Sequence, residues 1–260
     1  YVIARNVNRG VIELDRDGEF STFMGAIPVT PNLWDYIWKR LSTEAQRAGM
    51  VSFVPTEYNN IALDSDGFLY VTSGTAGESH QDPVRRLNLT GTDIMRRNGA
   101  HDIEGDVNFD YEGDGVTGPS VFIDVATYDD VTIFSLLDRN RGRIFTYDED
   151  GNLLFIYGNH ADQKGYFGTP TALDNFKRGL LVTDSKTNTL TYLEPTLFSS
   201  TIMDAINAHQ TGHYEEAQTL WKQVLQENSN SEQAYIGLGR TYLRTDEFTK
   251  AMEAFKLGND

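Results

Sequence analysis

The acidic residues between positions 102 and 114 are spaced in a way that could bind a metal ion. This stretch holds six Asp or Glu residues and no Lys or Arg in thirteen positions. Asp110, Glu112 and Asp114 alternate and Gly115 follows, as at the start of a calcium loop whose alternate side chains converge on the ion. The position that would supply the bidentate Glu is Val121. Calcium binding and a solvated acidic loop both stay open, and no other cofactor is indicated.

The other residues with catalytic potential form no recognisable constellation. His209 and His213 are four positions apart, but Gly212 between them indicates a turn, so we do not expect a zinc site. The absence of cysteine excludes disulfides, thiolate ligands and a thiol nucleophile. A G-x-S-x-G nucleophile elbow is also missing. The sequence therefore predicts a protein that is not an enzyme.

Charge and length limit the classes of partner. A formal net charge of −16 argues against nucleic acid, because the phosphates would be repelled. No run of 18 apolar residues is present, so we expect no transmembrane segment in this chain. Because the sequence begins at Tyr1 inside a strand-like segment, we expect it to be part of a longer protein.

A strand-turn-strand pattern recurs along the first three quarters of the chain. Residues 140–158 read as a hairpin in which Asp148 and Gly151 form the turn. Residues 8–25 repeat its spacing, and residues 84–95 are a weaker copy. Such units cannot bury an apolar face alone, so their repetition predicts packed sheets.

A second unit pairs an apolar strand with a strand that ends near Thr, Ser or Asp. The predicted pairs are residues 60–63 with 68–72, 119–125 with 131–136, and 170–174 with 180–184, and a last strand covers 189–193.

Four arginines at matching hairpin positions are predicted to form ion pairs with the acidic turns. The arginines are Arg9, Arg85, Arg141 and Arg143, and the turns begin at Asp15, Asp64 and Asp148.

Residues 28–55 interrupt the strand pattern with a predicted helical insert. Trp34, Ile37, Trp38 and Leu41 recur at helical spacing and form a wide apolar face. This face either packs on the sheets or forms an exposed aromatic patch for a protein partner or a carbohydrate ring. On the second interpretation Trp34 and Trp38 are partner-binding residues.

After residue 195 the pattern becomes helical. The predicted helices cover residues 199–209, 214–226, 233–243 and 248–257. Tyr214 and Phe248 are separated by 34 positions, as are Trp221 and Phe255. This period, with small residues at the contacts, resembles the tetratricopeptide repeat. The resemblance implies a concave face that binds peptide segments or another subunit, and the candidate groove residues are Lys222, Arg240, Arg244 and Lys250.

The strand units also resemble a known repeat. The pattern P-x-x-I-A-x-D, G-x-(L/I)-Y-V, N-R-(I/V) and D-x-x-G is similar to the NHL repeat of β-propellers. The matching residues are 60–64 with 67–71, 119–124, 140–144 with 148–151, and 8–11 with 15–18. The resemblance implies a fold of two parts. Residues 1–196 would form an NHL-like β-propeller, small or incomplete, with the helical insert at 28–55, and residues 197–260 would form tetratricopeptide helices.

This combination resembles bacterial extracytoplasmic proteins that are associated with carbohydrate ABC transporters. The resemblance implies a non-enzymatic scaffold or accessory subunit with protein partners, held at a membrane through segments outside this chain. The alternative is a propeller that binds a carbohydrate or small molecule, including a lactonase-like or lyase-like enzyme, with the helices as a tether.

Overall fold

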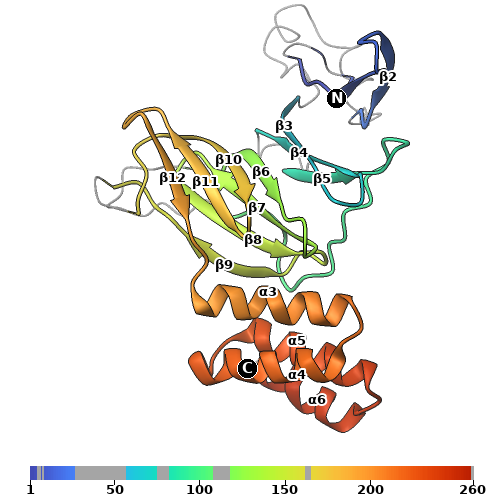
Figure 1. Ribbon diagram of the computed structural model, residues 1–260, viewed down its shortest axis with the longest axis vertical. Helices are drawn as coiled ribbons and strands as arrows, with labels where there is room; N and C mark the ends of the chain where they lie inside the picture. The colour runs from blue at the N-terminus through green and yellow to red at the C-terminus, as the bar shows by residue number, and fades with distance from the viewer. Residues whose placement is uncertain are drawn as a thin grey trace, which may run out of the picture.

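The computed structural model describes residues 1–4, 7, 9–26, 57–74, 82–107, 118–161 and 165–258. The sheets lie above and the helices below in Figure 1. The predicted insert at 28–55 with Trp34 and Trp38, and the predicted calcium ligands Asp110, Glu112 and Asp114, lie outside these residues.

Within the described residues, twelve strands form four antiparallel sheets. The sheets are β1 (Val11–Leu14) with β2 (Phe20–Met24); β3 (Tyr58–Leu63), β4 (Leu69–Ser73) and β5 (Val84–Leu87); β6 (Phe122–Thr127), β7 (Ile133–Asp138), β8 (Arg143–Asp148) and β9 (Leu153–Tyr157); and β10 (Pro170–Phe176), β11 (Gly179–Asp184) and β12 (Thr189–Leu193).

The three larger sheets share one construction. In each, the register of the first two strands shifts near the start of the first strand: at Tyr58 in β3, Phe122 in β6 and Pro170 in β10. In two of them an aspartate at the end of the second strand accepts backbone N–H groups from the chain that enters the first strand. Asp138 accepts from Val121 at 2.8 Å, and Asp184 accepts from Gly168 at 2.5 Å. The repeat predicted from the sequence is therefore a repeat of structure.

Sheet β6–β9 is packed on both faces. Along β7, Ile133 and Leu137 point into a core shared with β10–β12, while Phe134 and Leu136 point into a core shared with β3–β5. Successive residues of a strand face opposite sides, so a strand covered on both sides has apolar residues on both faces. All six residues of β7 are buried.

The first strands of these sheets are joined by hydrogen bonds. Asn59 Nδ2 of β3 donates to Phe122 O of β6 at 2.8 Å, and Leu173 N of β10 donates to Asp124 Oδ2 of β6 at 2.7 Å. Strand β6 therefore lies between β3 and β10 (Figure 1).

Four turns have one hydrogen-bond pattern. In the turn after Asp148, Oδ1 accepts from the N–H groups of Asp150 and Asn152, and Gly151 takes a φ of +90°. A positive φ is accessible to glycine without steric cost. The other three turns begin at Asp15, Asp64 and Asn88.

Four helices follow the strands in the described residues: α3 (Leu197–Gln210), α4 (Tyr214–Glu227), α5 (Glu232–Arg244) and α6 (Phe248–Leu257). The side chains of Thr196 and Ser231 cap α3 and α5 by accepting the N–H of Ser199 and of Ala234, respectively. Neighbouring helices approach closely at Gly237, where an added Cβ would lie 2.3 Å from the Trp221 ring.

Helix α3 joins the helices to the sheets. Ile202 and Met203 of α3 belong to the same core cluster as Leu180 and Val182 of β11. Gln210 Oε1 at the end of α3 accepts the N–H of Thr132 at 3.1 Å. The change from strand to helix falls close to the predicted boundary at 196/197, but the core continues across it, so a division into two domains stays a prediction.

Among the residues that the structure describes, no helix is long and apolar enough to cross a membrane.

Candidate functional site

A cavity of about 470 Å³ lies between the helices and the β8–β9 turn. One wall is α5, the second is the end of α3, and the third is the acidic turn of Asp148, Glu149 and Asp150. A cavity of this size accommodates a small ligand or a few side chains of a partner. We call it the helix–turn cavity.

Helix α5 contributes one continuous face to the helix–turn cavity. Its lining residues are Gln233, Ile236, Gly237, Arg240, Leu243 and Arg244. These positions are three or four apart, or adjacent, so they lie on one side of an α-helix. Leu243 is 45% exposed, which leaves an apolar side chain open to solvent beside two arginines.

The opposite wall is rigid because Asp148 fixes its own turn. Besides the two backbone N–H groups on Oδ1, Asp148 Oδ2 accepts from Asn152 Nδ2 at 2.7 Å. Burial raises the pKa of Asp148 above its usual value, while the bonds from Asn152 and the charge of Arg240 lower it.

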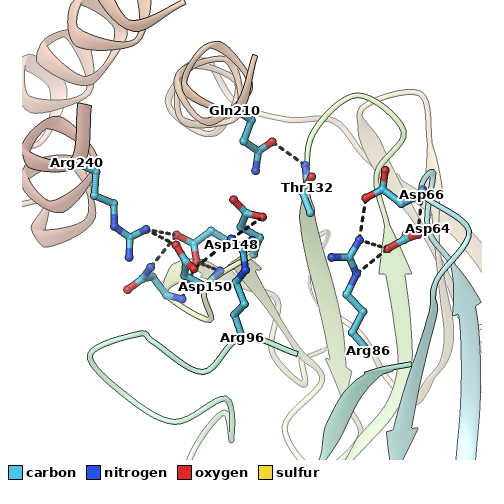
Figure 2. Close-up of polar contacts among 11 residues, drawn as sticks. Asp64, Asp66, Arg86, Arg96, Thr132, Asp148, Asp150, Gln210 and Arg240 are labelled. Atoms are coloured by element: carbon cyan, nitrogen blue, oxygen red, sulfur yellow. Dashed lines mark hydrogen bonds and ion pairs between the residues drawn. The ribbon is translucent and has the colours of Figure 1, made fainter. Parts of the chain in front are cut away.

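Two arginines hold this turn from different elements (Figure 2). Arg240 Nη1 of α5 lies 3.0 Å from Asp150 Oδ2 and 3.4 Å from Asp148 Oδ2. Arg96, in the chain after β5, lies 3.1 Å from Glu149 Oε2 and 3.6 Å from Asp150 Oδ1. Within the described residues, Arg244 forms no ion pair, although it lines the same cavity.

The turn after Asp64 is held in the same way by its own sheet. Arg86 Nη2 of β5 lies 2.5 Å from Asp64 Oδ2 and 2.9 Å from Asp66 Oδ2 (Figure 2). In both turns a guanidinium contacts the first and third residues of an Asp-x-Asp-Gly sequence. Helix α5 therefore supplies the arginine for the turn at Asp148, whereas strand β5 supplies it for the turn at Asp64.

His209 on α3 is part of the cavity wall. Burial and the charges of Arg244 and Arg240 lower its pKa below the usual value. Thr241 Oγ1 donates to Gly237 O at 2.7 Å, so it accepts from His209 Nδ1, which lies 3.1 Å away. Neutral His209 is then protonated on Nδ1, and Nε2 is an acceptor.

Trp221 of α4 lies behind the α5 face. It is 3% exposed, and Nε1 has no hydrogen-bond acceptor in the part of the chain that the structure describes. The indole packs on Gly237, the α5 residue without a side chain. An indole N–H that is buried without an acceptor loses a hydrogen bond to water, so this packing has an energetic cost.

The structure divides the predicted groove residues into two groups. Arg240 and Arg244 line the helix–turn cavity, as a groove requires. Lys222 and Lys250 instead lie over the Tyr242 ring, at 5.7 Å and 5.5 Å from its centroid. Lys222 and Lys250 do not line this cavity, so a single groove with all four basic residues stays a prediction.

The predicted arginine pairs are also partly wrong. Arg141 and Arg143 lie 3.7 Å and 2.8 Å from Asp106, not beside Asp148. Asp64 pairs with Arg86 rather than Arg85, because neighbouring residues of a strand face opposite sides.

Arg9 was also predicted to pair with an acidic turn, but it contacts an aromatic ring instead. Its guanidinium lies over the Phe23 ring, 5.6 Å from the centroid. This arginine contacts an aromatic ring of its own hairpin.

The role of Asp148, Asp150 and Arg96 at the cavity was not predicted from the sequence. The turn was predicted only as part of a hairpin, with its acids paired to arginines of the sheets. The available signal was the third acid, Glu149, which makes this turn more acidic than the turns at Asp15 and Asp64.

The structure shows no group of three possible metal ligands among the residues it describes. His213 lies outside α3, and its Nδ1 is 2.9 Å from Thr211 Oγ1.

Comparison with known families finds a match to the tetratricopeptide repeat over residues 208–259. This range includes α4, α5 and α6, and therefore the α5 wall of the cavity. No curated protein matches the sequence. Among solved structures, the chain is similar to the crystal structure of the computationally designed Ika4 protein, with 13% identity and a TM-score of 0.28. That match covers 56% of this chain and 96% of the designed one. The observed strands and the family match show a β-rich part followed by helices similar to tetratricopeptide repeats.

Proposed function

We propose that this protein is a non-enzymatic scaffold or accessory subunit that binds a partner protein through the cavity face of α5. The observation that supports this most is the tetratricopeptide match over residues 208–259, since such repeats are interaction modules. Arg244 and the exposed side chain of Leu243 give that face both a charge and an apolar contact.

The β-rich part belongs in this proposal as an NHL-like propeller, small or incomplete. Its support is the repeated register shift at Tyr58, Phe122 and Pro170, and the position of β6 between β3 and β10. In a propeller, such first strands would lie around the centre and the sheets would pack face to face.

The proposed location is extracytoplasmic, at a membrane and next to a carbohydrate ABC transporter. This part of the proposal rests on the sequence resemblance alone. It assigns the β-rich part to positioning and the α5 face to contact with a transporter subunit.

The test is to isolate the native protein from gently solubilised membranes and to identify co-purifying proteins by mass spectrometry. We expect transporter subunits at fixed stoichiometry, reduced several-fold by Arg244→Gln with Leu243→Ala. Lys222→Gln with Lys250→Gln is the matched control, because it changes basic residues that do not line the helix–turn cavity. Recovery of the protein alone, or equal loss in both variants, would contradict the proposal.

A second candidate function is supported by an aromatic cavity of about 420 Å³ between β9, β12 and α3. Tyr128, Phe155, Tyr157, Tyr192 and Phe198 are among its lining residues. Aromatic rings stack on sugar rings, so this cavity fits the carbohydrate-binding alternative.

Calorimetric titration with mono- and disaccharides tests this alternative. It predicts saturable binding that Tyr192→Ala weakens at least tenfold. Lactone turnover measured in the same samples would test the enzymatic form. No heat and no turnover with any sugar or lactone would reject it.

A further inference from the structure

We propose that the acidic β8–β9 turn competes with an acidic segment of the partner for binding to the α5 face. This inference rests on the proposed function, because it specifies the chemistry and the regulation of the same site. It commits the partner to carboxylate groups, supplied by Asp or Glu side chains.

The turn already acts as an acidic ligand of α5. Asp148 Oδ2 and Asp150 Oδ2 both face Arg240 Nη1, at 3.4 Å and 3.0 Å (Figure 2). The hydrogen bonds from the N–H groups of Asp150 and Asn152 to Asp148 fix the turn before this contact is made. A fixed pair of carboxylates binds a guanidinium with little loss of conformational entropy.

The Asp-x-Asp-Gly turn that begins at Asp64 makes the same kind of contact with an arginine. Asp64 and Asp66 contact Arg86 with the same two positions of the turn. There the arginine comes from β5 of the same sheet, so no interaction surface is involved. At α5, by contrast, the arginine lies on the wall of an open cavity.

The α5 face has room for a further acid. Arg244 lies four residues after Arg240, which places both on the same side of the helix. The turn neutralises Arg240 and Arg96, whereas Arg244 forms no ion pair with any residue that the structure describes. An incoming acidic segment can therefore bind Arg244 first.

Competition follows at Arg240. A second carboxylate of the incoming segment would share or replace the contacts that Asp150 makes. Because the turn is tethered, it is always present at high effective concentration and weakens binding of the partner. Removing the charge of Asp150 should therefore strengthen binding of an acidic segment.

The probe is the chain's own turn as a free peptide, residues 147–153: fluorescein-labelled Tyr-Asp-Glu-Asp-Gly-Asn-Leu with an amidated end. Its binding is measured by fluorescence anisotropy at low ionic strength. We expect Asp150→Asn to bind it about tenfold more tightly than the unchanged protein. Adding Arg240→Gln to Asp150→Asn should remove that gain.

Asp66→Asn is the matched control, because it neutralises the same position of the other turn. It should bind the peptide as the unchanged protein does. A peptide with Asn and Gln in place of its acids should not bind any variant.

The indole ¹H–¹⁵N signal of Trp221, assigned with Trp221→Phe, reports the location, since Trp221 lines the cavity. It should shift on peptide binding to Asp150→Asn. Equal binding by Asp150→Asn and the unchanged protein, an equal gain in Asp66→Asn, or binding of the neutral peptide would overturn the inference. Those results concern competition alone, whereas the proposed function fails only if no partner depends on the α5 face.

Discussion

Asp124 is a buried carboxyl group that links two sheets. It is 5% exposed, and it accepts the N–H of Leu173 at 2.7 Å and of Val125 at 2.8 Å. Burial raises its pKa from 3.8 to about 6, although both hydrogen bonds act to lower it. The desolvation of the ionised carboxylate therefore outweighs two favourable contacts.

This shift predicts a pH dependence of stability. The pKa of Asp124 is higher in the folded than in the unfolded protein, so protonation of Asp124 stabilises the fold. This stabilisation is fully present below about pH 4 and is lost as the pH rises through about 6. Relative to Asp124→Asn, the unfolding free energy should fall by about 2 kcal/mol between pH 4 and 7. Urea unfolding of both proteins across this range measures it.

Comparison with Asp124→Asn cancels the titration of the other groups. The asparagine can accept only one of the two N–H groups, so the variant should be less stable at low pH. Parallel pH profiles for the two proteins would show that the Asp124 pKa is not raised.

At the scale of elements, Gly237 permits the contact between α4 and α5. A Cβ at this position would lie 2.3 Å from Trp221 Cε2 and 2.5 Å from Cζ2. Alanine is about 1 kcal/mol better than glycine in a helix, but such overpacking costs typically 1–3 kcal/mol. We expect Gly237→Ala to lower the unfolding free energy by up to about 2 kcal/mol, measured by thermal or urea unfolding.

Trp221→Phe provides the control for this clash. Phenylalanine lacks the outer ring of the indole, so Gly237→Ala should cost less, or stabilise, in that background. Additive effects in the double-mutant cycle would mean that the two residues do not meet.

Most elements were predictable from local pattern. The strand at Thr189–Leu193 and the helix at Phe248–Leu257 have the predicted bounds, and the other helices differ by one or two residues. Apolar periodicity, the Asp-x-x-Gly turns and the 34-residue period are all local signals.

The candidate site was less predictable because it joins distant segments. Arg240 and Asp148 are 92 positions apart, and no local pattern relates them. Periodicity placed Arg240 on a helix face but could not show which element packs against that face. For the same reason, periodicity could not show that Lys222 and Lys250 lie outside the cavity that Arg240 lines.

At the scale of the whole molecule, the shared core predicts cooperative unfolding. The cluster around Ile202, Met203, Leu180 and Val182 includes side chains from both the helices and the sheets. Arg178, between β10 and β11, adds an ion pair to Asp204 of α3 at 2.8 Å. Loss of the helices would expose the apolar surface of β10–β12 to water.

We therefore expect one unfolding transition, seen at the same denaturant concentration by helical and by aromatic circular dichroism. Met203→Ala should shift both signals together, because Met203 lies in the shared core. Two transitions, with only the helical one shifted by Met203→Ala, would show instead that the helices and the sheets unfold as separate domains.

The proposed function depends on a partner protein that binds the cavity face of α5. The most direct test is photo-crosslinking in native membranes with a benzophenone amino acid at Leu243, which is exposed on that face. The matched position is Lys222, which lies on α4 over Tyr242. We expect one discrete crosslinked product from position 243 that Arg244→Gln diminishes, and none of the same mass from position 222. The same product from both positions, or none from position 243, would contradict it.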